Sequence, residues 1–217
     1  MKKLYVVASG SPVAFWYVGS YSGDPYPHVQ AMVILADLFA MLEQKQLLFV
    51  DRFASYSYVS CREKEIPISQ PFQPDRLEYW QRMLKCVDPI PVGAQFLNND
   101  ITVRGKSILY EDGQPKMYDG PLEVRFNLGW FPTMWLNLYA THFMPYYLDA
   151  SEPNPDYRAN YQRFRDFIEE LTEKYPDLEL VLDNNDCTPY AKMEGLEIKN
   201  LTYGDDGSMI SIEIHDD

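Results

Sequence analysis

The sequence predicts a single α+β domain, residues 1–217, in which a mixed, mostly antiparallel β-sheet carries three main helices and ends in a C-terminal β-hairpin. Two observations favour this class. Segments with helical spacing of apolar residues lie among segments with strand-like alternation, and no internal repeat, low-complexity tract or long linker divides the chain. A length of 217 residues also suits one substantial hydrophobic core.

The beginning of the chain is predicted to form two short strands. Residues 3–8 and 13–18 are rich in apolar and aromatic side chains, and a turn rich in Gly, Ser and Pro separates them. The first apolar run stops at Ser9, too early for a secretory signal peptide. No stretch reaches the roughly 18 apolar residues that a membrane-spanning helix needs. We therefore expect a cytoplasmic protein with no membrane partner.

Three helices are predicted from the spacing of apolar residues. The first extends from about His28 to Gln46, after a proline suited to a first helical turn. The second begins at Pro74 and ends before Pro89. The third begins at Asn154–Asp156, where a capping side chain, a proline and an acid suit a helix start. Its apolar stripe comprises Tyr157, Tyr161, Phe164, Ile168, Leu171 and Tyr175.

Strands are predicted between these helices. Leu47–Val50 and Ala54–Ser60 are rich in aromatic and β-branched residues, and a Pro-rich link at Ile66–Pro71 follows them. Apolar and polar residues alternate from Leu122 to Trp130, which is typical of a half-buried strand.

The end of the chain is also predicted to be β-structure. Leu178–Leu182 is mostly apolar, which favours a strand in the interior of the sheet. Leu196–Tyr203 and Met209–His215 flank the turn Gly204–Gly207, which predicts a closing hairpin.

Almost all of the net negative charge lies in the last third of the chain. Residues 1–148 contain 13 Lys and Arg against 14 Asp and Glu, a net charge of −1, whereas residues 149–217 contain 6 against 18, a net charge of −12. A surface of one sign repels nucleic acid and anionic membranes and attracts a basic partner. Acidity also keeps proteins soluble, but solubility alone does not require the charge to gather at one end of the chain.

Residues 126–147 are the most aromatic part of the chain. Their rings belong to Phe126, Trp130, Phe131, Trp135, Tyr139, Phe143, Tyr146 and Tyr147. Stacked on one face of a sheet, these rings would form a core cluster. The alternative is that Trp130 and Trp135 expose part of their surface at a binding site.

No catalytic motif is present in the sequence. The chain contains no Gly-rich phosphate-binding loop, no dinucleotide fingerprint, no GxSxG and no HExxH, and its three cysteines lack zinc-ligand spacing. We therefore predict a protein that is not an enzyme and has no catalytic residue, cofactor or metal ion. The alternative is a small hydrolase or transferase that uses Asp183 and Asp186, with or without a metal. The same two residues also suit a turn.

Three segments resemble a known family. The strand Lys3–Val7, the long helix that begins near His28 and the segment Gly129–Pro132 are similar to the immunity protein 52 family of bacterial polymorphic toxin systems. Immunity proteins neutralise a toxin, often a nuclease, that the same cell or a neighbour makes. The resemblance implies that this chain binds and neutralises a cognate toxin encoded beside it.

Charge complementarity leads to the same kind of partner. A nuclease that binds phosphate has a positively charged cleft, which an acidic inhibitor can occupy or flank. We therefore predict an acidic, aromatic-containing face that binds a toxin with a basic surface, because aromatic anchors supply most interface energy. Its predicted members are Glu169, Glu170, Glu173, Asp183, Asp186, Glu197, Glu213, Trp130 and Trp135. An adaptor that binds a basic peptide without inhibiting it is a further alternative.

Overall fold

The computed structural model describes the central sheet and two long helices. The described residues are 12–19, 28–57, 62–67, 99–126, 133–147, 152–180, 188, 190–203 and 209–211. The predicted strand at residues 3–8 and the predicted helix that begins at Pro74 lie outside them.

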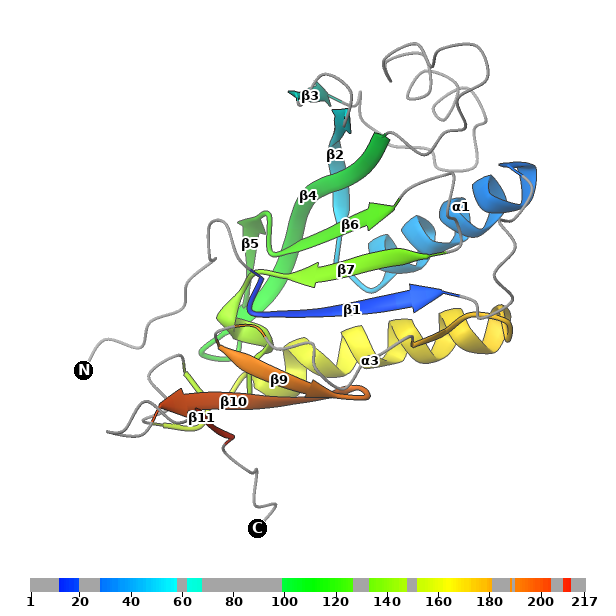
Figure 1. The fold of residues 1–217 in the computed structure, drawn as a ribbon. Helices are drawn as coiled ribbons and strands as arrows, with labels where there is room; N and C mark the ends of the chain where they lie inside the picture. The colour runs from blue at the N-terminus through cyan, green and yellow to red at the C-terminus, as the bar shows by residue number, and fades with distance from the viewer. Residues whose placement is uncertain are drawn as a thin grey trace.

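An eight-stranded sheet forms the centre of the fold (Figure 1). Its strands are β1 (Ala14–Gly19), β2 (Phe49–Ser57), β3 (Arg62–Pro67), β4 (Asn99–Glu111), β5 (Gln114–Asp119), β6 (Leu122–Phe126), β7 (Met134–Leu138) and β8 (Glu179–Leu180). Their order is β3-β2-β4-β6-β7-β1-β8, and β5 pairs with the second half of β4. Every described pairing in this sheet is antiparallel, so the predicted α+β class with a mostly antiparallel sheet is confirmed.

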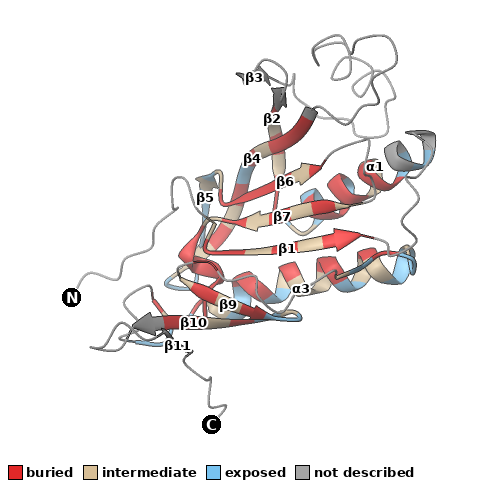
Figure 2. Cartoon of the chain, viewed as in Figure 1, coloured by how far each residue is buried: buried red, intermediate tan, exposed pale blue. Residues whose placement is uncertain are grey.

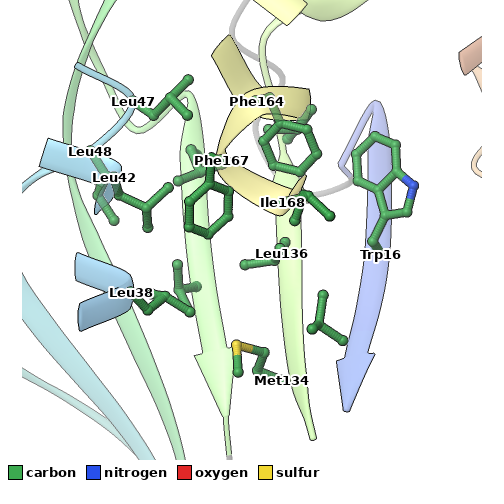
Figure 3. Close-up of a cluster of buried hydrophobic side chains, with 14 of the residues drawn as sticks. Trp16, Leu38, Leu42, Leu47, Leu48, Met134, Leu136, Phe164, Phe167 and Ile168 are labelled. Carbon is green, nitrogen blue, oxygen red and sulfur yellow. The ribbon is translucent and has the colours of Figure 1, made fainter. Parts of the chain in front are cut away.

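Two α-helices lie on one side of this sheet (Figures 1 and 3). They are α1 (His28–Gln44) and α3 (Tyr157–Lys174), and a short 3-10 helix, η2 (Thr141–Phe143), precedes α3. The first and third predicted helices are therefore confirmed, and the described residues contain two of the three expected helices. None of the described helices is long and apolar enough to span a membrane.

The hydrophobic core lies between the sheet and the two helices. Trp16 of β1 and Leu136 of β7 point toward Phe164 and Phe167 of α3, and all four side chains are fully buried (Figures 2 and 3). Burial of one large apolar side chain stabilises the fold by about 1.5–3 kcal/mol. The predicted stripe of α3 is confirmed at four positions, and Phe167 adds a fifth apolar contact. The four are Tyr161, Phe164, Ile168 and Leu171.

A second, three-stranded sheet follows α3. It consists of β9 (Ala191–Glu194), β10 (Glu197–Tyr203) and β11 (Met209–Ser211), in the order β11-β10-β9. The predicted C-terminal hairpin is confirmed, because β10 and β11 pair antiparallel with Leu201 opposite Ser211.

Three strand predictions were wrong in detail. Residues 47–60 were predicted to contain two strands, but β2 is a single strand with an irregularity between Val50 and Arg52. Ile66–Pro67 was assigned to a link, but it belongs to β3, where an edge position tolerates a proline. Leu178–Leu182 was expected inside the sheet, but β8 stands at the end of the described strand order and pairs only with the last residues of β1.

The predicted start of α3 is correct in position but different in detail. Asn154 accepts a hydrogen bond from the backbone N–H of Asp156, and its amide group donates to the carbonyl oxygens of Thr141, His142 and Met144. The Asp156 side chain does not cap the helix. Its carboxylate instead accepts the backbone N–H groups of the turn that joins β4 and β5.

Candidate functional site

The second half of α3 carries acidic residues at exposed positions. Glu169 and Glu173 are exposed and stand one helical turn apart. Neither has a cationic partner among the described residues. Glu170 differs from them, because its carboxylate lies 2.8 Å from Nζ of Lys45 at the end of α1. The structure therefore brings together two of the three predicted glutamates as an uncompensated pair.

The acidic side chains continue beyond the helix. Leu178 is 2% exposed and anchors the turn after α3, where its backbone N–H donates to the carbonyl oxygen of Tyr175. Asp177 and Glu179, on either side of this anchor, are exposed. The sequence analysis missed both; the alternation around a buried leucine was the signal for them. We call Glu169, Glu173, Asp177 and Glu179 the acidic surface.

Several cations of the last third are used inside the molecule. The Arg163 guanidinium donates to the carbonyl oxygens of Lys45 and Ile108 and stacks 5.3 Å from the Tyr110 ring. Lys192 and Lys199 both pair with Glu194 on the second sheet. These contacts occupy three of the six cations in residues 149–217.

Lys174 lies between Glu173 and Asp177 in the sequence, but it is also paired inside the molecule. Its Nζ lies 2.7 Å from a carboxylate oxygen of Asp37 on α1, and the Tyr175 hydroxyl donates to the same carboxylate. Burial alone would raise the pKa of Asp37, but the hydrogen bonds from Lys174 and Tyr175 outweigh burial and hold this pKa below its ordinary value. Asp37 therefore stays charged and keeps Lys174 turned toward α1.

Glu197 lies near the other half of α3. The Tyr161 hydroxyl donates to the carbonyl oxygen of Leu196, which places the β9–β10 turn beside the first half of the helix. Tyr161 precedes Glu173 by 12 positions, so the two residues are about 18 Å apart along the helix axis. Glu197 is exposed but does not adjoin the acidic surface.

Trp135 lies on the opposite side of the sheet from α3. Its neighbour Leu136 points into the core, so alternation along β7 directs Trp135 to the outer face. The Arg125 guanidinium lies 5.6 Å from the Trp135 ring, and the Tyr17 ring meets it edge-on, also at 5.6 Å. Arg125, Trp135 and Tyr17 thus form a row on the outer face of the sheet, and Trp135 is half-buried in it. The predicted aromatic anchor and the acidic surface therefore face in different directions.

Two ion pairs accompany Trp135 on the outer face of the sheet. Arg104 donates a 2.8 Å hydrogen bond to Glu123, and Arg125 pairs with Asp100. The Tyr139 hydroxyl also donates to Glu123; burial and the Glu123 carboxylate raise the pKa of this hydroxyl well above its ordinary range. The alternating pattern of β6 predicted a solvated polar face; instead, Glu123 is buried in a hydrogen-bonded network.

Four predicted site residues lie outside the described residues: Trp130, Asp183, Asp186 and Glu213. The alternative site for a hydrolase or transferase at Asp183 and Asp186 belongs to this group. Among the described residues, no cluster of three or more His, Cys, Asp or Glu side chains is arranged to hold a metal ion.

Comparison with known proteins gives no relative. No family model, no curated protein and no solved structure matches this chain.

Proposed function

We propose that the chain is an immunity-type protein that binds a basic protein toxin through the acidic surface. The observation that carries the proposal is the set of uncompensated carboxylates at the end of α3 and the start of β8. The sequence resemblance to toxin immunity proteins supports the same partner class. Association with a nuclease would place this surface in or beside the phosphate-binding cleft of the toxin.

The position of the two glutamates is unfavourable for the helix itself. Glu173 lies in the last turn of α3, where a carboxylate opposes the helix macrodipole at a cost of about 0.3–1 kcal/mol. Like charges four residues apart, as in Glu169 and Glu173, cost a further 0.2–0.5 kcal/mol, approximately. Lysine or glutamine would stabilise this part of α3 better. An arrangement that opposes folding and has no described internal partner supports a role in binding.

The acidic surface is expected to act mainly on the rate of association. Complementary charge can raise an association rate by about 10- to 1000-fold at low salt, and screening removes this gain. Trp135 faces away from α3, so we expect it to contribute little to the same contact.

The test uses the toxin domain encoded beside this chain as the binding partner. The variant Glu169→Lys/Glu173→Lys should slow association at least about tenfold at low ionic strength and should protect toxin-producing cells less well. The control Glu43→Lys/Glu152→Lys changes the net charge equally at exposed acids outside the acidic surface. Trp135→Ala should leave the association rate unchanged.

Equal association rates for the two charge-reversed proteins would contradict the assignment of this surface. A purified neighbouring toxin domain that binds neither variant nor the wild-type chain would contradict the immunity function itself. A complex that forms without loss of toxin activity would instead favour the adaptor alternative.

A further inference from the structure

His142 is a fully buried histidine at the centre of η2. The ring of Tyr118, on β5, lies 4.7 Å from the His142 ring and is tilted against it. The Nε2 atom of His142 is 4.0 Å from a carboxylate oxygen of Glu111, on β4. The hydroxyl of Tyr118 donates to the same carboxylate. Tyr118 and Glu111 therefore meet over His142.

Charged groups from three elements face this histidine. They are Glu111 on β4, Lys116 on β5 and Asp156 before α3. Burial lowers the pKa of His142 to about 4, although the carboxylates of Glu111 and Asp156 act in the opposite direction. The neutral ring is thus the form that fits the closed structure.

β5 buries few side chains; it is held by its ladder with β4 and by the ion pairs Lys116–Glu111 and Asp119–Arg52, in which Lys116 and Asp119 are largely exposed. All of its residues are exposed except Tyr118, which is half-buried against the core. Among the described strands, β5 pairs only with β4. Elements with few buried contacts open at a lower free energy than the whole fold.

The part of β4 opposite β5 is held independently. Asn160 exchanges two hydrogen bonds with the backbone of Tyr110, and Arg163 donates to the carbonyl oxygen of Ile108. β5 can therefore separate from β4 while β4 stays attached to α3. Gly120, with φ of +70°, follows β5, and its N–H donates to the carbonyl oxygen of Gly105 on β4, which fixes this end of β5 when the rest separates.

We propose that β5 is an acid-sensitive flap over His142. In the closed state, Tyr118 and Glu111 cover the neutral ring. When β5 opens, His142 reaches water and takes up a proton. Protonation then holds the flap open while the central strands remain folded.

The sign of the effect follows from linkage. The opened state has a histidine with an ordinary pKa near 6.5, whereas the closed state holds this pKa at about 4. The opened state therefore binds more protons between these values, and opening becomes more favourable as pH falls. Between pH 7 and pH 5, the opening equilibrium of β5 should increase about 20-fold. At lower pH, protonation of Glu111 also favours opening, because the hydrogen bond from Tyr118 lowers the pKa of Glu111 in the closed state.

The test is amide hydrogen exchange of the whole chain by NMR, with each rate divided by the intrinsic rate at the same pH. The backbone amides of Lys116 and Tyr118, opposite Leu109 and Ser107 of β4, report on the flap. Their protection should fall about 20-fold from pH 7 to pH 5 and should hardly depend on low concentrations of urea, as local opening requires.

Two variants separate protonation from packing. His142→Phe keeps an aromatic ring under Tyr118 and should abolish the pH dependence of flap protection. Tyr118→Phe keeps the ring contact but removes the hydrogen bond to Glu111, so it should lower protection at both pH values without changing the ratio. An unchanged pH dependence in His142→Phe would overturn the proposal.

If the variants do not fold, the His142 ring can be titrated by NMR in the wild-type chain. The Cε1 proton of His142 should not titrate near pH 6.5 while Lys116 and Tyr118 remain protected. A His142 that titrates there with β5 still closed would also overturn the proposal.

Discussion

The indole N–H of Trp16 donates a 2.8 Å hydrogen bond to the carbonyl oxygen of Gly195, 179 positions further along the chain. Beside it, the hydroxyl of Tyr161 donates to the carbonyl oxygen of Leu196. Two carbonyl groups of the β9–β10 turn thus accept hydrogen bonds from aromatic side chains of β1 and α3. The Trp16 ring also lies 4.9 Å from the Phe164 ring, tilted against it, so the same residue joins the large sheet, α3 and the second sheet.

Replacement of Trp16 by phenylalanine is expected to destabilise the fold by about 2 kcal/mol. The change removes the hydrogen bond to the Gly195 carbonyl, worth about 0.5–1.5 kcal/mol, and adds a small cavity beside Phe164. Urea unfolding measures the loss. Trp135→Phe, on the half-buried outer row, should cost less than half as much, and an equal loss at both positions would contradict this interpretation.

The sequence predicted those elements whose core-facing apolar residues recur at regular spacing. α1 and α3 were found because their apolar side chains recur at helical spacing, and the C-terminal hairpin because two alternating segments flank a Gly-rich turn. Strand boundaries were less accurate. The irregularity after Val50 places polar residues inside β2, which local alternation interprets as a break.

The site was predicted less completely, because side-chain partners come from distant parts of the chain. The sequence assigned Glu170 to the acidic face, and nothing in it indicated an internal role for Arg163. The partners of Arg163 are carbonyl groups at Lys45 and Ile108, and the partner of Glu170 is the Lys45 side chain. No local pattern contains that information. Trp135 was grouped with the acids because aromatic anchors supply interface energy, whereas strand alternation directs it to the other face.

Gly105 is expected to be the glycine least tolerant of substitution among those described. A Cβ atom there would lie 2.0 Å from the carbonyl oxygen of Phe49 and 2.9 Å from Cα of Val50. Both are backbone atoms, so Gly105→Ala must separate β2 from β4, and we expect a loss of roughly 3 kcal/mol or more.

The matched control for Gly105 is Gly113 in the β4–β5 turn. Its Cβ would meet no atom within 4 Å, but its φ of +72° is strained for alanine. Gly113→Ala should therefore cost only about 1 kcal/mol. Thermal or urea unfolding that gives the reverse order would show that the β2–β4 contact is looser than the structure indicates.

Asn160 is expected to be the most important polar side chain of α3 for stability. It is fully buried, accepts the backbone N–H of Tyr110 at 2.7 Å and donates to the carbonyl oxygen of the same residue at 2.9 Å. Asn160→Ala removes both bonds together with a contact to Arg163, and should lower the free energy of unfolding by about 2–4 kcal/mol.

Asn160→Asp provides the comparison. The Asp carboxylate can still accept hydrogen bonds from the Tyr110 N–H and from Arg163. It cannot donate to the Tyr110 carbonyl oxygen, so two buried oxygen atoms face each other with no hydrogen between them, which is unfavourable. The variant should therefore become more stable relative to wild type as the pH is lowered and the carboxyl group takes up a proton. A stability difference that does not change with pH would contradict the observed hydrogen-bond pattern.

Glu194 is expected to hold together two lysines that face each other on the second sheet. Lys192 and Lys199 are directly opposite in the β9–β10 register, and both contact the Glu194 carboxylate, at 2.9 and 2.8 Å. Hydrogen bonds from Lys199 and Lys192 lower the pKa of Glu194 to about 2. Because the folded pKa lies below the ordinary value of 4.5, the stabilisation is complete above pH 4.5 and is lost between that pH and about 2.

The variant Glu194→Gln should therefore melt at a lower temperature than wild type at neutral pH and low salt. The difference should shrink in about 0.5 M NaCl and vanish near pH 2. Glu43→Gln, at an exposed acid on α1, serves as the control. A difference between Glu194→Gln and wild type that persists in acid would mean that Glu194 stabilises the hairpin by packing and not by charge.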